Sequence, residues 1–427
     1  MQITRSSRRA LAVSAALALG LAACTTKDDD DTSTEGGDGG GGGEVATGPG
    51  VTDDTITLGM LVDLHGPYAA LGQSVSRGVQ LYWDERNADG GVCDREVELE
   101  SRDHGYDAQA AVSFYSEIHE DILALQNSLG SPMTTALLPD IEADAMLTLP
   151  VSWASSLLEN PYIVMGGTTY DLEIVNGISW LMENEGLEEG ATVGHIYAQG
   201  EYGENGLRGS QIMADRHGFE LVDEQVQGTQ SDMTSQVNVL QQAGAEFVML
   251  TVTPTQAASA VQVAESNGYD MTFLGSNPTF VPSLLDGPAA DGLAANFFLV
   301  SSYSPFSSEA DGPTMVRDAY KAEYPDETYD FGPMFGYAQA QVLGQIIDAA
   351  CEAGDITREG LTAAFEDLSE VDTEGLIAPL DYSTEQGVPP ANQVYVAKPN
   401  AEVEGGLEVV QELFASEDAE DYEPVGG

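Results

Sequence analysis

The stretch that most constrains the fold runs from residue 56 to residue 91, because it contains one complete strand, turn and helix. Residues 56–62 are mostly apolar, which is typical of a strand covered on both faces. Pro67 and Gly72 interrupt this pattern, and apolar residues at helical spacing follow. In open α/β sheets, ligands bind at the loop between such a strand and its helix. The stretch therefore predicts a mostly parallel sheet with a ligand site at its carboxyl edge.

Strand and helix patterns alternate along most of the chain. Further strands are predicted at residues 97–102, 122–126, 146–149, 162–165, 192–197, near 221, and at 247–252, 271–274, 294–303, 376–382 and 393–398. Helices are predicted at residues 108–119, where Asp107 is placed to cap the first turn, and at 332–353. The pattern restarts at Ala191 as a repeat of architecture rather than of sequence. With a length of 427 residues, it predicts two doubly wound α/β lobes.

The chain is strongly acidic, with 71 acidic and 14 basic residues and a formal charge of −57. This charge argues against nucleic acid as a partner, because phosphates bind basic surfaces. It also means that attachment to an anionic membrane requires an anchor rather than a basic patch. Such acidity suits a protein kept soluble in concentrated salt, and it equally suits any strongly solvated surface.

The first residues have the order of a secretory signal peptide. Arg5, Arg8 and Arg9 precede an apolar run at residues 10–23, which is too short to span a membrane. The run ends in Leu-Ala-Ala-Cys, which resembles a bacterial lipobox and makes Cys24 the lipidated first residue of the mature protein. An ordinary cleavage site with an incidental cysteine is the alternative. The adjacent arginines leave twin-arginine export open beside the general route.

A linker of low apolar content follows the predicted lipid site. Residues 24–50 are acidic and glycine-rich, and they cannot bury enough apolar surface to fold. The aspartates at residues 28–31 lack the spacing of a calcium loop, so we interpret them as solvated linker. Two acyl chains on Cys24 would anchor the protein stably to the outer face of the cell membrane.

Cys93 and Cys351 remain as candidates for a disulfide in an extracytoplasmic protein. Cys93 follows the end of the first helix, and Cys351 lies near the end of the helix predicted at residues 332–353. If these helices are neighbours and run in the same direction, both cysteines lie together on the face away from the ligand cleft. We therefore predict a bond between them.

Two segments resemble anion sites at first. In the run SLGSPMTT at residues 128–135, Ser131 fits an N-cap and Pro132 the first helical position, so that free N–H groups face an anion. A well-capped helix without a ligand is the competing interpretation. The glycine-rich turn at residues 200–206 has neither the G-x-G-x-x-G pattern nor a P-loop lysine, which argues against phosphate binding.

Several motifs, in their order and spacing, make the chain resemble a known family. They are LHGPYAALG at residues 64–72, NADGG at 87–91, YGENG at 202–206, and Tyr337-Ala338 in the late helix. The family is that of the extracytoplasmic solute-binding proteins of branched-chain amino-acid type ABC transporters, with the type I periplasmic-binding fold. The resemblance covers roughly residues 55–398.

The resemblance implies two lobes joined by three crossover segments, with a ligand between them. Lobe 1 would comprise residues 51–172 and 303–372, and lobe 2 residues 173–302 and 373–410. Residues 411–427 have the composition of a disordered acidic tail.

The same resemblance assigns ligand-binding positions by motif. They are His65, Leu71, Leu129, Ser131, Met133, Ser152, Trp153, Tyr202, Thr253 and Asn277. Ser131, with the backbone around Leu129 and Met133, would bind a ligand carboxylate, and Tyr202 would be an aromatic lid from lobe 2. Trp153 could equally belong to the core. His65 and Leu71 differ from the residues common in the family.

Asn277 is a departure from the family pattern. It stands where amino-acid binders place a carboxylate against the ammonium group of the ligand, and a neutral amide loses most of that charge-assisted interaction. The solute is therefore expected among amino acids, amides or ureas, and small carboxylic acids, with a preference for those lacking an ammonium group.

These observations favour a monomeric binding protein that delivers a small solute to an ABC permease with its ATPase, without cofactor, metal or catalytic residues. The five histidines lack metal-ligand spacing, and the chain has no nucleophile elbow or H-E-x-x-H motif. A hydrolase built from distant residues and a sensor that works with a separate membrane partner remain alternatives.

Overall fold

The computed structural model describes residues 45–422, and these residues contain two main β-sheets. The first sheet has four parallel strands in the order β3-β2-β4-β5. Its strands are β2 (Thr55–Val62), β3 (Glu96–Asp103), β4 (Leu125–Leu129) and β5 (Thr148–Val151). Its helices are α1 (Ala69–Ala88), α2 (Ala108–Ile118) and α3 (Ser131–Asp144), with α10 (Gly332–Ala353) and α11 (Arg358–Glu366) added from late in the chain. This is one doubly wound α/β lobe.

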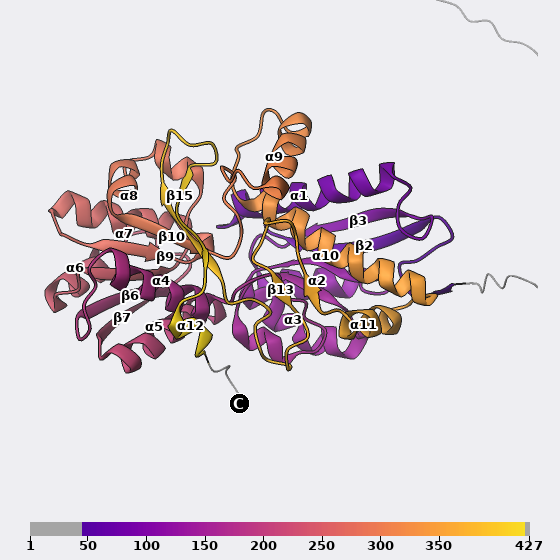
Figure 1. Cartoon of the computed structure of the whole chain (residues 1–427), viewed down its shortest axis with the longest axis horizontal. Coiled ribbons are helices and arrows are strands. Elements are labelled where there is room, and N and C mark those ends of the chain that lie inside the picture. Colours follow the sequence, from indigo (N-terminus) through magenta and orange to yellow (C-terminus); the bar gives the residue numbers. More distant parts are fainter. Residues whose placement is uncertain (1–44, 423–427) are drawn as a thin grey trace, which may run out of the picture. The chain divides into compact units, whose positions relative to one another are not determined.

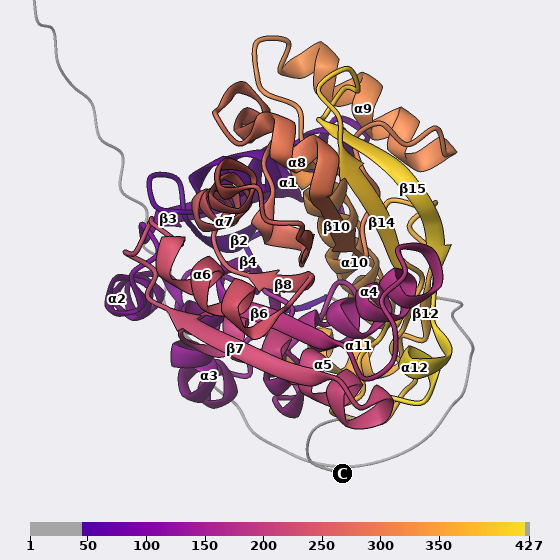
Figure 2. The same ribbon diagram turned by 90° about the vertical axis from the view of Figure 1, so that its left-hand side faces the viewer.

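The second sheet has seven strands in the order β15-β14-β10-β9-β8-β6-β7. Five are parallel: β6 (Thr192–Ala198), β7 (Glu220–Val226), β8 (Phe247–Thr251), β9 (Thr272–Gly275) and β10 (Phe297–Ser301). The strands β14 (Val394–Pro399) and β15 (Leu407–Phe414) extend the sheet antiparallel beyond β10, as Figure 2 shows. The helices of this layer are α4 (Tyr170–Asn184), α5 (Glu201–His217), α6 (Thr234–Ala243), α7 (Pro254–Asn267) and α8 (Ala290–Asn296).

Short elements complete the described chain. Two small sheets pair β1 (Ala46–Thr47) with β11 (Asp355–Ile356) and β12 (Glu370–Val371) with β13 (Leu380–Asp381). The 3₁₀ helices are η1 (Ser155–Glu159), η2 (Asn277–Thr279) and η3 (Pro282–Asp286), and the remaining helices are α9 (Asp311–Glu323) and α12 (Glu417–Glu420). No helix within residues 45–422 is long and apolar enough to cross a membrane.

The chain passes between the two sheets three times: after β5, after β10 and before β14. Isolated bridges tie these passages together, between Thr168 and Ala391 and between Tyr303 and Ile377. In each sheet the connections change direction at one point, between β2 and β4 and between β6 and β8. Ligands bind at the carboxyl ends of strands at such switch points. The predicted fold of two doubly wound lobes with three crossovers is confirmed.

The helices α1 and α10 lie side by side and run in the same direction (Figure 1). Glycines allow their close approach. A Cβ on Gly78 would lie 2.5 Å from the Pro333 carbonyl oxygen, and a Cβ on Gly336 would lie 2.1 Å from the Val75 carbonyl oxygen. Further along the pair, Arg86 forms an ion pair with Asp348. The helices lead to the disulfide between Cys93 and Cys351, whose Cα atoms are 6.1 Å apart. The predicted bond and the parallel helices that would form it are confirmed.

Several sequence-based predictions differ from the structure. Residues 162–165 contribute only a bridge at Ile163 rather than a strand, and residues 376–382 contain the bridge at Ile377 and the two-residue β13 instead of one continuous strand. The third strand begins at Leu125 instead of residue 122. The glycine-rich turn predicted at residues 200–206 is mostly helix, because α5 begins at Glu201. Local composition resembles a turn here, but the packing of α5 against α4 decides the outcome.

Residues 411–422 are also ordered, which corrects the prediction of a disordered tail for this part of the segment, whereas residues 423–427 lie outside the described residues. Residues up to Phe414 form β15, and α12 follows with Ser416 as its N-cap. Asp418 accepts hydrogen bonds from Ser179 and Arg216, and the Tyr422 hydroxyl donates to Asp171 at 2.6 Å. These specific partners compensate for the acidic composition of the segment.

Candidate functional site

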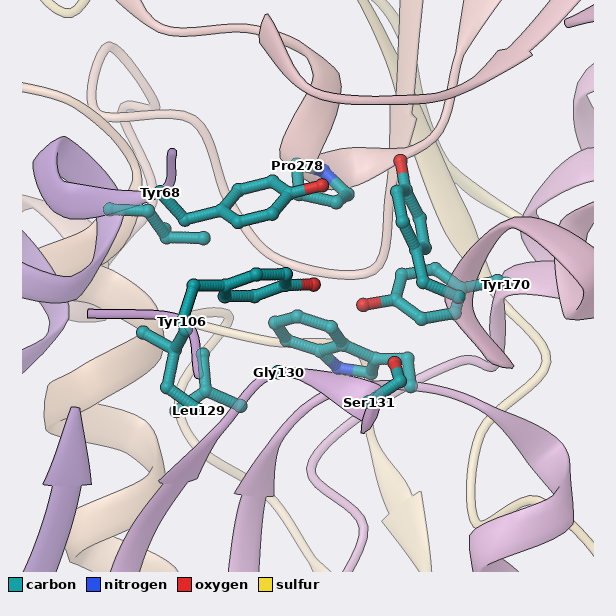
Figure 3. A pocket seen from close by; sticks show the side chains of 11 residues that line it. Tyr68, Tyr106, Leu129, Gly130, Ser131, Tyr170 and Pro278 are labelled. Atoms are coloured by element: carbon teal, nitrogen blue, oxygen red, sulfur yellow. The ribbon is translucent and has the colours of Figure 1, made fainter. Parts of the chain in front are cut away.

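A small pocket lies at the carboxyl ends of the strands, between side chains of both sheet layers (Figure 3). The cavity between these side chains has a volume of only about 20 Å³. It is lined by Tyr68, Leu71, Tyr106, Leu129, Gly130, Ser131, Val151, Trp153, Tyr170, Tyr202 and Pro278. None of these residues carries a charged side chain, so hydroxyl groups, backbone N–H groups and aromatic rings define its chemistry.

The loop after β2 is organised by the buried Asp63. Its carboxylate accepts hydrogen bonds from the N–H groups of Gly66 and Tyr68, at 2.5 and 3.0 Å. A Cβ on Gly72 would lie 1.9 Å from the Asp63 carbonyl oxygen, so the last glycine of the motif is required for close packing. This conformation of the loop and of the start of α1 places Tyr68 and Leu71 in the pocket wall.

The amino end of α3 forms the floor of the pocket. Gly130 is the N-cap, with a φ of 97° that favours glycine, and Ser131 is the first helical residue. Ser131 was predicted to be the N-cap, but its hydroxyl group instead bonds that of Ser152, with 2.6 Å between the oxygens. The first intrahelical bond runs from Thr134 N–H to Gly130 C=O. The N–H groups of Ser131 and Met133 precede it and suit an anionic group.

Aromatic rings form most of the remaining wall. The ring centroids of Tyr68 and Tyr106 are 4.8 Å apart, and those of Tyr170 and Tyr202 are 4.7 Å apart. In Figure 3 the hydroxyl groups of Tyr106 and Tyr170 point toward each other. Burial raises the pKa of Tyr170 and of Tyr202 well above the usual value, so both are neutral hydrogen-bonding groups. Tyr106 has a φ of 64°, a sparsely populated conformation that concentrates at functional sites.

Tyr202 and Trp153 connect the pocket to the two layers. The Tyr202 hydroxyl group bonds that of Ser276 at 2.9 Å, so the ring rather than the hydroxyl group faces the pocket. Trp153 is 1% exposed and packs on Phe335, with 4.6 Å between the ring centroids. Trp153 is therefore a pocket residue and a core residue at once.

The other predicted site residues lie outside the pocket lining. Met133 is buried beside Gly130. Ser152 does not line the pocket itself but holds the Ser131 hydroxyl group by a hydrogen bond. His65 is exposed and pairs with Asp103, and Thr253 caps α7 in a capping box with Gln256. In each case a local partner, which the motif alone does not reveal, occupies the side chain.

Asn277 is buried behind the pocket wall, and its neighbour Pro278 lines the pocket instead. The Asn277 side-chain amide donates to Glu173 at 2.9 Å, and its backbone N–H donates to the same carboxyl group at 3.2 Å. Burial raises the pKa of Glu173 well above its usual value, although the Asn277 donors act in the opposite direction. A carboxyl group does lie near this position, but it belongs to Glu173 and faces Asn277.

Six lining residues were not predicted from the sequence: Tyr68, Tyr106, Gly130, Val151, Tyr170 and Pro278. Tyr68 lies inside the LHGPYAALG motif and Gly130 directly precedes Ser131, so both were within reach of the motif argument. Tyr106 lies in the loop after β3 and Tyr170 is the first residue of α4, and no sequence pattern marks either as a pocket residue. Their convergence is a consequence of the tertiary fold.

The pocket suits binding of a neutral or anionic group and contains no acid, base or metal ligand set. Within residues 45–422, no group of three or more His, Cys, Asp or Glu side chains could hold a metal ion. His195 is buried between Ser210 and Thr251, at 2.8 and 2.9 Å, and serves packing of the second sheet. Cys24, the predicted lipid site, lies outside the described residues.

Comparison with known proteins places the chain in a broad group. The family model described as periplasmic binding protein matches residues 55–406. The chain is 39% identical to a fatty acid ABC transporter substrate-binding protein from Thermomonospora curvata, whose structure is solved. The likeness covers 88% of this chain and 97% of that one, with a TM-score of 0.86.

More distant relatives share the fold. A branched chain amino acid ABC transporter from Thermus thermophilus, solved with bound valine, is 21% identical, with a TM-score of 0.74 over 86% of this chain and 98% of that one. A Leu/Ile/Val-binding protein homolog of Brucella abortus is 22% identical over 315 residues, which is 69% of this chain and 76% of the relative. These relatives are named as binding or transport proteins.

Proposed function

Since the chain belongs to the periplasmic binding protein family, we propose that it is the solute receptor of an ABC transporter and that its solute is a small carboxylic acid without an ammonium group. The observation that carries this proposal is the amino end of α3, where Gly130 and Ser131 line a pocket without a charged side chain. A carboxylate is one of the anions that bind at the amino end of a helix.

Hydrogen-bond donors at the pocket suit a carboxylate. The N–H groups of Ser131 and Met133 precede the first bond of α3, and the Ser131 hydroxyl group can donate to a solute when it accepts the hydrogen bond from the Ser152 hydroxyl group. The hydroxyl groups of Tyr106 and Tyr170 lie on the facing side (Figure 3). Hydrogen bonds to a charged acceptor are worth roughly 1.5–3 kcal/mol each, because the pocket excludes water.

An ammonium group would lack a partner in this pocket. The Asn277 amide is directed to Glu173, whose carboxyl group favours its neutral form and does not line the pocket. The Thermomonospora relative, at 39% identity, is named as a fatty acid substrate-binding protein, which supports a carboxylic acid without an ammonium group for this chain as well.

Binding requires the two lobes to separate. A cavity of about 20 Å³ holds roughly one water molecule, so a carboxylic acid cannot fit while the lobes are in contact. The pocket walls come from different layers: Tyr68 and Ser131 lie in the loop after β2 and in α3 of the first layer, and Tyr202 and Pro278 lie in α5 and η2 of the second. Hinge bending at the three crossovers would open this interface and close it on the solute. We assign residues 51–172 and 303–372 to lobe 1. Lobe 2 comprises residues 173–302 and 373–410, and we extend it through residue 422.

We further propose that the protein is a monomer on the outer face of the cell membrane. Residues 1–23 would be removed as a signal peptide, Cys24 would carry the lipid, and the residues between Cys24 and β1 would tether the lobes, because the end of the predicted 24–50 linker is ordered where β1 pairs with β11. The disulfide between Cys93 and Cys351 supports an oxidising location. Mass spectrometry of the exported protein tests this part, because a Cys24→Ser variant should lose both the lipid and membrane retention.

A thermal-shift and calorimetric screen tests the solute class. A ligand at about 100 times its dissociation constant adds roughly 2.7 kcal/mol to the free energy of unfolding. We expect octanoate to shift the melting temperature more than octanamide, leucine, valine or choline. The largest shift with leucine, valine or choline would contradict the proposal.

A variant pair locates the carboxylate. Ser131→Ala removes a donor from the pocket and should weaken octanoate binding about tenfold. Ser116→Ala, at an exposed position on α2, is the matched control and should have no effect. Unchanged affinity of the Ser131→Ala protein would place the carboxylate elsewhere.

A further inference from the structure

A second cavity, with a volume of about 130 Å³, shares part of its wall with the ligand pocket. Tyr68, Leu71 and Pro278 line both cavities. We call the second cavity the outer chamber. Because these three side chains border both spaces, a movement of these side chains would join the two spaces into one elongated site.

The outer chamber leads from buried aromatic residues to the protein surface. Phe280 and Phe331, which are 0% and 3% exposed, form its inner wall. Ala70, Thr255 and Ser283 also line it, and all three are exposed. The chamber therefore connects the wall of the ligand pocket with solvent.

The chemistry of the outer chamber is apolar. None of its lining residues is charged, and most are proline, aromatic or aliphatic. Its volume is close to the roughly 150 Å³ of an engineered apolar protein cavity that binds benzene. An apolar group of about six carbons fits such a space, whereas an ionic group would lose its hydration there without a partner.

We infer that the outer chamber receives the hydrocarbon chain of the same solute whose carboxylate lies at the amino end of α3. This inference rests on the proposed function and specifies its solute as a straight-chain carboxylic acid, with a chain too long for the inner pocket. The polar donors at Ser131 and Tyr170 lie at one end, and the apolar chamber continues from the other. An amphiphile with one anionic end matches this order.

The wall between the two spaces is built to part when the lobes open. In Figure 3 the Tyr68 side chain extends toward Pro278. Tyr68 follows β2 of the first sheet, and Pro278 belongs to η2 beside the second sheet. Separation of the lobes moves these residues apart, so a chain laid across the open cleft would lie between them after closure.

Titration calorimetry with straight-chain carboxylates tests the inference in the intact mature protein. From butanoate to octanoate, we expect the affinity to rise about fourfold per methylene group, which corresponds to roughly 0.8 kcal/mol of buried CH₂. Ser283→Trp fills the chamber from its exposed rim, where a larger side chain leaves the core intact. It should weaken octanoate binding at least tenfold and leave butanoate binding within about twofold.

Two further variants keep the experiment decisive. Ser266→Trp, at an exposed position of α7 outside both cavities, is the matched control and should bind both acids as the unmodified protein does. Leu284→Phe fills the chamber at a second, half-buried position and should reproduce the Ser283→Trp result.

The outcomes separate this inference from the proposed function. Equal affinities for all chain lengths, or octanoate binding that survives both Ser283→Trp and Leu284→Phe, would overturn the outer chamber as a chain site while leaving the carboxylate site intact. Failure of every carboxylate to bind would overturn the proposed function, and this inference with it.

Discussion

Asn277 donates two hydrogen bonds to the carboxyl group of Glu173, one from its side-chain amide at 2.9 Å and one from its backbone N–H at 3.2 Å. Both residues are fully buried, and they join η2 to α4. Asn277 therefore serves as the internal partner of Glu173. This explains why an asparagine suits a position at which a second carboxylate would meet a buried carboxyl group.

Asn277→Asp should destabilise the protein. The change places two buried carboxyl groups in contact, which raises the pKa of both and opposes their ionised forms. Leaving a buried polar group without its hydrogen-bond partner typically costs about 1–3 kcal/mol. When a carboxyl group has a raised pKa in the folded state, the free energy of unfolding falls as pH rises through that pKa. The variant should therefore lose more stability at about pH 7 than at about pH 5. Urea unfolding at both pH values measures it, with the exposed Asn267→Asp as control. Equal stabilities of the Asn277→Asp and unmodified proteins would contradict this view of the pair.

Replacements of Tyr202 separate the role of its ring from that of its hydroxyl group. Tyr202→Ala removes the ring from the pocket wall and should weaken carboxylate binding at least tenfold. Tyr202→Phe keeps the ring but loses the bond to Ser276, so it should lower stability by about 1 kcal/mol with little change in affinity. Calorimetry and urea unfolding give both values. Tyr269→Ala, which lies in the second layer outside the pocket, is the control and should bind as the unmodified protein does. Unchanged affinity of the Tyr202→Ala protein would show that the solute binds elsewhere.

Removal of the disulfide should lower stability without changing affinity. A Cys93→Ser/Cys351→Ser double variant should lose roughly 2–5 kcal/mol, since the bond constrains the unfolded chain. The bond lies beyond the end of α1, whose 20 residues span about 30 Å, whereas the pocket lies at its start. Solute affinity should therefore remain within about twofold. Two free thiols in unreduced peptides of the unmodified protein would refute the bond itself.

The buried His195 should make the protein less stable in acid. Burial lowers its pKa to about 3, whereas the unfolded chain has a pKa of about 6.5. Below about pH 6.5 the unfolded state binds a proton that the folded state does not, so stability falls as pH decreases from there toward 3. The expected loss between about pH 7 and pH 5 is about 2 kcal/mol. In His195→Gln this loss should shrink, and in the exposed control His65→Gln it should persist.

The acidic surface should make stability depend on salt. With 71 acidic and 14 basic residues, repulsion opposes the compact state, and salt screens it. Between about 0.01 M and 1 M salt the Debye length shortens from roughly 30 Å to 3 Å, so the melting temperature should rise. A melting temperature that does not change with salt would contradict salt adaptation. The acidic residues would then serve only to keep the surface solvated.

The fold was largely readable from the sequence because its signals are local and periodic. The helix predicted at residues 332–353 matches α10, and Asp107 caps α2 by accepting from the Ala110 N–H. The strand predicted at residues 162–165 failed because an apolar run does not specify a partner strand, and only Ile163 forms a bridge.

The site was readable only in part. Leu71, Leu129, Ser131, Trp153 and Tyr202, which the resemblance assigns to ligand binding, lie together in the lining of one pocket. Tyr106 and Tyr170 come together from elements far apart in the chain, which no local pattern encodes. Asn277, predicted as a ligand-binding residue, lies behind the pocket wall, because its orientation depends on Glu173, a partner 104 residues away.

The parallel pair of α1 and α10 has a consequence for the order of folding. The disulfide that ends the pair joins residues 258 positions apart, and the chain between them contains most of the second sheet. Helix α10 therefore cannot pack on the first sheet layer until most of the chain has been synthesised. Contacts of such long sequence separation fold slowly, because loop closure precedes the energy gained from packing. An early fragment that ends before Gly332 would expose the apolar face of α1, so nascent chains of this length are the stage at which the protein most needs protection from aggregation.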